Sequence, residues 1–257
     1  MTDYLNTESG QIEILWHNKE NKGPVLIFLH EGLGCVKMWK TFPERLASKT
    51  NCPAMVFSRF GYGQSDPEPL PWKINFMHKQ ALTVLPEIIK AAGIKEYILV
   101  GHSDGGSIAA IFAGSSHCTG LRGLITLAAH LFCEGITVES IQKAKDHYQN
   151  GNLKQKLEKY HGPNTENAFR GWNDVWLNAT FIHWNIEKYL SRINTPMLAI
   201  QGKDDPYGTD RQIHSIKKNV KNTKTVLIDN CGHAPHLEKP DTVQDIMTDF
   251  IKKIIEI

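Results

Sequence analysis

The chain has 257 residues, which is long enough to bury a sizeable core, and α/β folds of this length often form a single domain. Its 29 Lys and Arg residues nearly balance 27 Asp and Glu residues, whereas proteins that bind nucleic acids or membrane surfaces usually carry a strong basic excess. No apolar run reaches the length of a membrane span, and the polar, acidic start MTDYLNTESG does not resemble a signal peptide. These features predict a cytoplasmic protein that binds neither nucleic acid nor membranes.

The cysteines and histidines do not form a pattern typical of disulfide or metal sites. The five cysteines are odd in number, widely scattered and without a C-x-x-C pair. The pair His233 and His236 comes nearest to ligand spacing, but Pro235 between them disfavours a helix and no acidic partner completes a metal set nearby. We therefore expect free thiols, no metal and no cofactor.

Short apolar runs alternate with helix-like stretches along most of the chain, which is typical of a mostly parallel sheet with helices on both faces. The run 25–29 is continuously apolar and predicts a strand that is buried on both faces. Residues 11–17 alternate apolar and polar side chains, which predicts a half-exposed edge strand. Further strands are expected at 54–60, 97–101, 121–129, 197–202 and 225–229.

Helices are expected between these strands, and one long segment interrupts the alternation. The expected helices cover 38–49, 74–92, 106–115, 210–220 and, opened by Pro240, 241–254. From residue 131 to residue 192 the periodicity is helical and the chain carries three tryptophans. We therefore predict a core domain of residues 1–130 and 193–257 and an inserted helical lid of residues 131–192. A lid suits the carboxyl edge of an open α/β sheet, where ligands bind.

The stretch LVGHSDGGSIAA, residues 99–110, places Ser103 between glycines where an apolar run ends and a small-residue helix begins. A glycine-rich turn of this kind is common, and G-x-S-x-G alone is weak evidence for a nucleophile. The alternative is a nucleophile elbow, in which the serine adopts a strained backbone and its neighbours lack a β-carbon so that strand and helix can approach closely. That interpretation requires a base, an acid and an oxyanion site elsewhere in the chain.

Three other strand ends supply these groups. Asp205 follows the strand 197–202, and an acid at this place can orient a histidine and stabilise its charged form. His233 follows the strand 225–229, and a glycine-rich turn, 30–34, follows the strand 25–29 and can direct a backbone N–H toward an oxyanion. The order Ser103, Asp205, His233 is the order associated with the elbow motif.

With these segments the chain resembles the α/β-hydrolase superfamily, and within it the small cytoplasmic serine hydrolases that include carboxylesterases and meta-cleavage-product hydrolases. The resemblance covers essentially the whole chain and rests on the oxyanion loop 30–34, the R-x-G-x-G-x-S loop 59–65, the elbow 101–105, the acid turn 202–205 and the histidine turn 232–233. It implies an α/β-hydrolase fold and a Ser103–Asp205–His233 triad. It also implies oxyanion donation by the backbone N–H groups of Gly32 and Asp104.

The chain departs from the family pattern at two places. Glu31 stands where the family usually has glycine after the oxyanion-loop histidine. Ser58 precedes Arg59, where relatives often have aspartate. Neither departure removes a member of the predicted triad.

Several assignments have competitors. Asp204 competes with Asp205 as the acid, although the family spacing favours Asp205 and Asp204 could instead cap its own turn. His236 competes with His233 as the base, but its place at the approach to the last helix favours a structural or rim position. The tryptophans are expected mainly in the lid core, with one or two of them left open as pocket residues. The substrate-pocket candidates, chosen from strand ends and the lid, are Leu33, Phe132, Trp184 and Tyr207.

The function predicted on these grounds is hydrolysis of a small-molecule carboxylic ester or thioester through an acyl-enzyme on Ser103. A C–C bond hydrolase of the meta-cleavage-product type would use the same triad and remains an alternative. So does a slow-turnover ligand receptor on the same fold. The sequence leaves the substrate, and whether the chain forms a homodimer, open.

Overall fold

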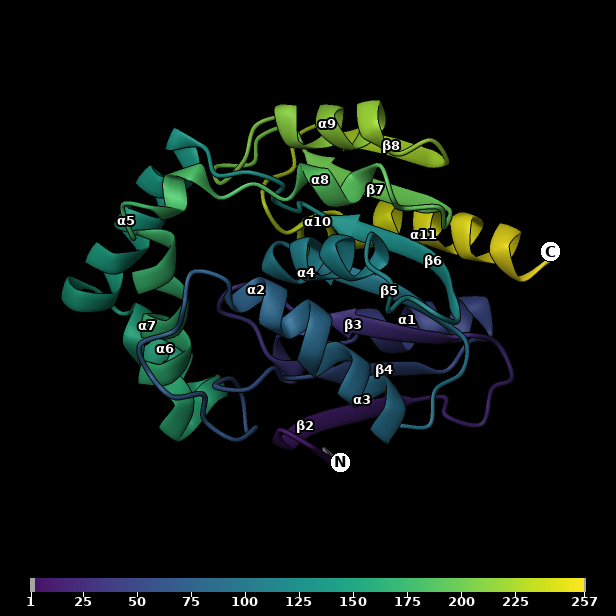
Figure 1. The fold of residues 1–257 in the computed structure, drawn as a ribbon, viewed down its shortest axis with the longest axis horizontal. Helices are drawn as coiled ribbons and strands as arrows, with labels where there is room; N and C mark the ends of the chain where they lie inside the picture. The colour runs from purple at the N-terminus through teal and green to yellow at the C-terminus, as the bar shows by residue number, and fades with distance from the viewer. Residues whose placement is uncertain (1–2, 257) are drawn as a thin grey trace.

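The computed structural model describes residues 3–256, and an eight-stranded sheet forms the centre of this part of the chain (Figure 1). The strand order is β1-β2-β4-β3-β5-β6-β7-β8. The strands are β1 Asp3–Thr7, β2 Gly10–His17, β3 Val25–Leu29, β4 Ala54–Phe57, β5 Tyr97–His102, β6 Leu121–Leu127, β7 Met197–Gly202 and β8 Thr223–Ile228.

The sheet is mostly parallel, as the sequence predicts. Strands β4, β3, β5, β6, β7 and β8 run parallel, while β2 pairs antiparallel with both β1 and β4. The prediction that residues 11–17 form an edge strand is wrong, because β1 lies outside β2 and was not predicted. β1 is short and polar, and it becomes a strand only by pairing with β2, so its own pattern carries little signal.

Helices cover both faces of the sheet, which confirms the predicted α/β arrangement. They are α1 Phe42–Thr50, α2 Phe76–Lys79, α3 Leu85–Ala91, α4 Asp104–Ala113, α5 Gly135–Asn150, α6 Leu153–His161, α7 Thr165–Trp176, α8 Glu187–Leu190, α9 Arg211–Asn219, α10 Pro235–Glu238 and α11 Pro240–Ile255. Within residues 3–256, no helix combines the length and the apolar character that a bilayer crossing needs.

The helix predicted at 74–92 is divided into α2, a π-helical turn at Gln80–Val84, and α3. Pro86 lies just inside α3 and has no N–H to donate to the preceding turn. Its ring also crowds the carbonyl four residues earlier, and a π-helical turn relieves that crowding while the chain continues in the same direction. A proline inside an otherwise helical pattern thus explains the interruption.

Two apolar layers hold the helices to the sheet. One layer packs α2, α3, α4 and α9 against one face, with Ile88 and Ile108 among its fully buried side chains. The other packs α1 and α11 against the opposite face, with Leu46 and Met247 fully buried. The strands between these layers are rigid supports, and the turns at their carboxyl ends carry the candidate site.

The segment between β6 and β7 forms a separate group of helices. Figure 1 shows α5, α6 and α7 together beyond one end of the sheet. Near its start and its end, this segment is joined by an antiparallel bridge between Phe132 and Asn185. The N–H of Ile186 also donates to the carbonyl of Leu131. α8 returns to the core, where it packs on α4 and α9. We call residues 131–192 the helical insertion.

Candidate active site

Ser103 lies in a strained turn between β5 and α4. Its φ is 51° and its ψ is −119°, in the region that L-residues rarely adopt. A β-carbon at position 101 would overlap the backbone of Gly105, and one at position 105 would overlap the carbonyl of Leu29. Glycine at both places is therefore required for strand and helix to approach, and the turn projects the serine at the carboxyl end of β5.

His233 lies between Ser103 and Asp205. Its Nε2 is 2.9 Å from Oγ of Ser103, and its Nδ1 is 2.9 Å from each carboxylate oxygen of Asp205. Because a carboxylate only accepts, Nδ1 carries the hydrogen and Nε2 of the neutral ring presents a lone pair to the serine hydroxyl. The three side chains predicted from distant parts of the sequence are thus brought into one hydrogen-bonded chain.

Asp205 is held as an ionised acceptor. Its side chain is 1% exposed, and the N–H of Tyr207 donates to Oδ1 at 2.8 Å. Burial alone raises the pKa of this carboxyl, but the hydrogen bond and charge of His233, together with the Tyr207 amide, outweigh burial and hold the pKa below its ordinary value. Asp205 can therefore orient His233 and stabilise its charged form.

The two competing residues lie elsewhere. Asp204 is exposed to solvent and its backbone N–H donates to the carbonyl of Cys231. His236 is buried, with 3% of its surface exposed, and packs against Trp39, Phe42 and His102. His236 is therefore a core residue and does not line a rim.

Arg59 fixes the loop 30–34, the predicted oxyanion loop, by hydrogen bonds. The Arg59 guanidinium donates to the carbonyls of His30 and Glu31, and the Arg59 backbone N–H donates to Nε2 of His30. Burial and the Arg59 charge hold the pKa of His30 well below its ordinary value, which keeps the ring neutral and able to accept that bond. The N–H groups of Gly32 and Asp104 donate to no other group within residues 3–256. Both residues line the cavity beside Ser103.

Glu13 supplies a carboxylate beside Ser58. Oε2 of Glu13 accepts from the Ser58 hydroxyl at 2.7 Å and from the backbone N–H of Gln64 at 3.0 Å. Ser58 in turn accepts from the N–H of Val36. Glu13 of β2, the strand that pairs with β4, thus provides the carboxylate that an aspartate at position 58 would provide in the family pattern.

A cavity of about 100 Å³ adjoins Ser103. Its lining contains Glu31, Gly32, Leu33, Ser103, Asp104, His130, Ile141, Trp172, Trp176, Tyr207 and His233. Of the pocket candidates from sequence, Leu33 and Tyr207 belong to this wall. Phe132 and Trp184 do not: Phe132 lies in a surface groove beneath the guanidinium of Arg211, and Trp184 packs on Trp176 and Phe181.

Five residues of the wall were not predicted as site residues: Glu31, His130, Ile141, Trp172 and Trp176. Trp172 and Trp176 lie four residues apart on α7, a spacing that places both on one face of a helix. Gly32 lies so close to the indole of Trp172 that a β-carbon at position 32 would overlap it. His130 follows β6, so its position just past a strand end carried the same signal as His233. Ile141 of α5 had no distinguishing signal.

Asp104 carries a buried carboxyl with one unpaired oxygen. Oδ1 accepts from Nε1 of Trp176 at 3.2 Å, whereas Oδ2 has no hydrogen-bond partner within residues 3–256. Burial raises the pKa of this carboxyl from 3.8 to about 6, although the nearby charge of Arg59 opposes the rise. At neutral pH the ionised form therefore carries a desolvation cost.

We expect Asp104→Asn to stabilise the protein more near pH 7 than near pH 4.5. As the pH falls through about 6, folded wild type takes up a proton that the unfolded chain, with its pKa of 3.8, does not yet bind. Between pH 7 and pH 4.5 its free energy of unfolding therefore gains roughly 2 kcal/mol from this group, and the variant lacks that change. Urea unfolding of both proteins across this pH range measures the difference, in which other titrating groups largely cancel. A difference that is constant with pH would contradict the expectation.

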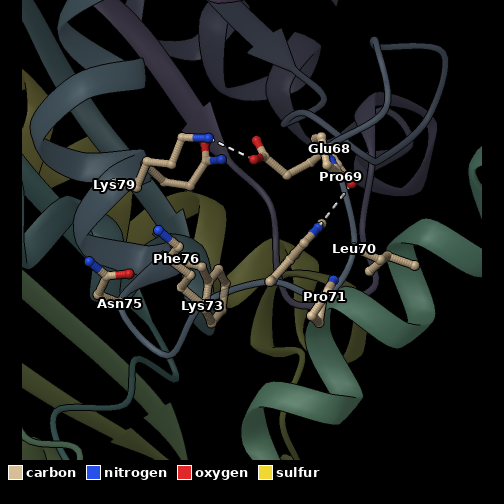
Figure 2. A pocket seen from close by; sticks show the side chains of 10 residues that line it. Glu68, Pro69, Leu70, Pro71, Lys73, Asn75, Phe76 and Lys79 are labelled. Carbon is tan, nitrogen blue, oxygen red and sulfur yellow. Dashed lines mark hydrogen bonds and ion pairs between the residues drawn. The ribbon is translucent and has the colours of Figure 1, made fainter.

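A second cavity, of about 450 Å³, lies between the loop that precedes α2 and α2 itself. Figure 2 shows Pro69, Leu70 and Phe76 around it, with the ion pair between Lys79 and Glu68 at 2.6 Å. None of the three residues predicted for catalysis lines it. We therefore assign it no part in the chemistry at Ser103.

No group of three or more His, Cys, Asp and Glu side chains within residues 3–256 is arranged to hold a metal ion. The five cysteines all have free thiols, and burial raises the pKa of Cys231, the one nearest to His233 in the sequence, to about 11.

The sequence profile described as the alpha/beta hydrolase family matches residues 26–246, which is most of the chain. The chain belongs to the alpha/beta hydrolase family. Proline iminopeptidase of Thermoplasma volcanium is 24% identical to this hydrolase over 276 aligned residues, covering 92% of this chain and 91% of the relative. Human serine hydrolase BPHL is 24% identical over 201 residues, covering 75% of this chain and 67% of the relative.

Solved structures share the fold of this hydrolase. An esterase from Exiguobacterium antarcticum superposes with a TM-score of 0.79 at 16% identity, covering 98% of this chain and all of the esterase chain (100%). The enol-lactonase from Burkholderia xenovorans superposes with a TM-score of 0.76 at 14% identity, covering 97% and 99% of the two chains. At these identities the likeness establishes the α/β-hydrolase fold, as the sequence predicts.

Proposed function

We propose that this protein is a serine hydrolase that cleaves a small-molecule carboxylic ester or thioester through an acyl-enzyme on Ser103. The observation that carries the proposal is the unbroken chain from Oγ of Ser103 through His233 to Asp205, with each link at 2.9 Å. Similar proteins named as an esterase, an enol-lactonase and proline iminopeptidases support hydrolysis at an acyl carbon.

In the proposed reaction His233 accepts the Ser103 proton at Nε2 while Oγ attacks the substrate carbonyl carbon. Asp205 holds Nδ1–H and stabilises the imidazolium that forms. The N–H groups of Gly32 and Asp104 bind the oxyanion of the tetrahedral intermediate, and such donors typically contribute about 3 kcal/mol each. His233 then protonates the leaving group, and a water that His233 deprotonates releases the acid.

The helical insertion serves as a lid in this proposal, with residues 1–130 and 193–257 as the core domain. Trp172 and Trp176 of α7 and Ile141 of α5 contribute an apolar wall to the cavity beside Ser103. A volume of about 100 Å³ accommodates roughly seven to ten non-hydrogen atoms. The lid thus limits the acyl group, and we propose short-chain acyl substrates.

Ile141→Ala is expected to lengthen the preferred acyl chain. Ile141 is 1% exposed, and its truncation removes three carbon atoms from the cavity wall. Each methylene accepted by an apolar pocket contributes about 1 kcal/mol or more, so kcat/KM for hexanoate relative to acetate should rise at least about tenfold. Ile136→Ala on the exposed face of the same helix is the matched control and should leave this ratio unchanged. An unaltered ratio in Ile141→Ala would remove α5 from the acyl pocket.

The proposal is tested with a fluorophosphonate probe followed by peptide mass mapping, and then with p-nitrophenyl esters from acetate to octanoate. We expect a single adduct on Ser103 and turnover that declines as the acyl chain lengthens. An adduct on Ser103 without ester turnover would favour the C–C bond hydrolase, or the receptor if single turnovers stall. Absence of an adduct would contradict a serine hydrolase altogether.

A further inference from the structure

His102 connects the strand that carries the nucleophile to the loop that carries His233. Its ring is 3% exposed, and Nε2 lies 2.8 Å from the backbone carbonyl oxygen of His233. Because a carbonyl only accepts, the hydrogen of the bond belongs to Nε2 of His102. The backbone of the proposed base is therefore tied directly to β5.

The other ring nitrogen of His102 faces a carboxylate. Nδ1 lies 3.4 Å from Oε2 of Glu31, whose side chain is 23% exposed. A neutral ring with its hydrogen on Nε2 presents a lone pair at Nδ1, and two acceptors that face each other at this distance repel. One proton on Nδ1 replaces this repulsion with an ion pair.

The surroundings favour that proton. Burial by itself raises the pKa of Glu31, but the contact with His102 and its charge hold this pKa far below its ordinary value. The ring centroid of His236 lies 4.7 Å from that of His102, and the ring centroid of His233 lies 5.2 Å from it. Burial, then the charge of His102, holds the pKa of His236 well below its ordinary value, so that neighbour is neutral.

The position of Glu31 is fixed by its own loop. A β-carbon at position 34 would overlap the Glu31 carboxylate, so Gly34 leaves the space that the carboxylate occupies. The Glu31 carbonyl accepts from Nδ1 of His30 at 2.7 Å and from Arg59 at 3.0 Å. Glu31 is also part of the cavity wall next to Gly32, the proposed oxyanion donor.

We propose that Glu31 and His102 share one proton, bound to Nδ1 of His102, and form a positioning pair that joins the oxyanion loop to the His233 loop. Asp205 orients His233 through its side chain, and the Glu31–His102 pair orients it through its backbone. The pair also neutralises a carboxylate that would otherwise oppose the oxyanion. These kinetic consequences rest on the proposed acyl transfer at Ser103, whereas the shared proton does not.

A double-mutant cycle measures the kinetic consequence. His102→Gln keeps an amide donor near the position of Nε2 but leaves Glu31 without a cation, so kcat should fall on the order of 10²-fold with a smaller change in KM. Glu31→Gln alone should stay within about tenfold of wild type, because its amide can donate to neutral Nδ1. The double variant should recover most of the lost kcat, because no unpaired charge remains.

His236→Gln is the matched control for this cycle, because His236 is an equally buried neighbour that contacts neither Glu31 nor the His233 carbonyl through a hydrogen bond in the described residues. Adding Glu31→Gln to the His236→Gln variant should not raise its kcat. Full activity of His102→Gln, or a double variant no better than His102→Gln, would overturn the positioning role. Thermal unfolding of each variant separates a loss of fold from a loss of kcat.

Nitrogen-15 NMR of the histidine rings tests the shared proton without reference to activity. We expect Nδ1 of His102 to be protonated in wild type near pH 7 and unprotonated in Glu31→Gln, with the signal assigned by its loss in His102→Gln. An unprotonated Nδ1 in wild type would overturn the pair. If wild type gives no ester turnover, the proposed function fails, and the NMR result still decides whether the pair exists.

Discussion

Replacement of Ser103 with alanine is expected to lower kcat for a short-chain ester by about 10⁵-fold or more. The variant has no hydroxyl to form the acyl-enzyme, and water must attack the carbonyl directly in a site arranged for the serine. A residual acceleration of about 10³-fold over the uncatalysed reaction should persist, because the N–H groups of Gly32 and Asp104 still face the oxyanion. Initial rates at high enzyme concentration, with background hydrolysis subtracted, measure this residual acceleration.

Ser107→Ala is the matched control. Ser107 lies one turn further along α4, and its hydroxyl donates to the carbonyl of His130 at 2.6 Å and lies 3.3 Å from the backbone carbonyl of Ser103, but it makes no hydrogen bond to His233 within the described residues. Its loss should cost roughly 1 kcal/mol of unfolding free energy and leave kcat within about tenfold of wild type. Activity of Ser103→Ala within about 100-fold of wild type would show that another group acts as nucleophile.

The placement of Ser103, Asp205 and His233 could be predicted because each residue follows an apolar strand. Parallel strands bring their carboxyl ends to one edge of a sheet, so local strand signals determine which distant loops meet. The same reasoning applies to His130, which follows β6 and lines the cavity, although it carries no recognised motif. The core layers follow from periodicity, since the apolar faces of α1 and α11 need the sheet to bury them.

The acyl pocket could not be predicted in the same way. The hydrophobic periodicity of the sequence does not determine how inserted helices lie over a sheet edge. It therefore did not indicate which of the three tryptophans line the cavity. Trp172 and Trp176 face the cavity, whereas Trp184 follows the turn after α7 and packs on Phe181. Phe132 follows a strand, but the bridge to Asn185 occupies its backbone and its ring lies in a surface groove.

The departures at positions 31 and 58 show a second limit. Ser58 lacks the family carboxylate, and Glu13 supplies one from β2, which lies far away in sequence and pairs with β4. Glu31 stands where the family usually has glycine, and its carboxylate lies 3.4 Å from His102 of β5. Contacts of this kind join residues on different strands, so they depend on the strand order and register of the sheet. A single sequence does not reveal that order or register.

Asp205→Asn is expected to lower kcat by about 10⁴-fold while the fold is kept. An asparagine amide facing Nδ1 of His233 donates where the carboxylate accepted, so the ring hydrogen moves to Nε2. Nε2 then presents a hydrogen to Oγ of Ser103 at 2.9 Å and has no lone pair to accept the serine proton. The variant also has no negative charge to stabilise the imidazolium in the transition state.

Asp204→Asn is the matched control, because it makes the same chemical change at the adjacent position, on an exposed side chain, whereas Asp205 is the aspartate that contacts His233. Its kcat should equal that of wild type within about twofold, since exposed charges contribute little. Fluorophosphonate labelling should slow in parallel with ester turnover in Asp205→Asn, because both need His233 as the base. If the two aspartates exchanged these outcomes, Asp204 would be the acid and the loop after β7 would adopt another conformation during catalysis. If neither substitution mattered, His233 would act without an acid, and the 2.9 Å contacts to Asp205 would serve only to fix the loop.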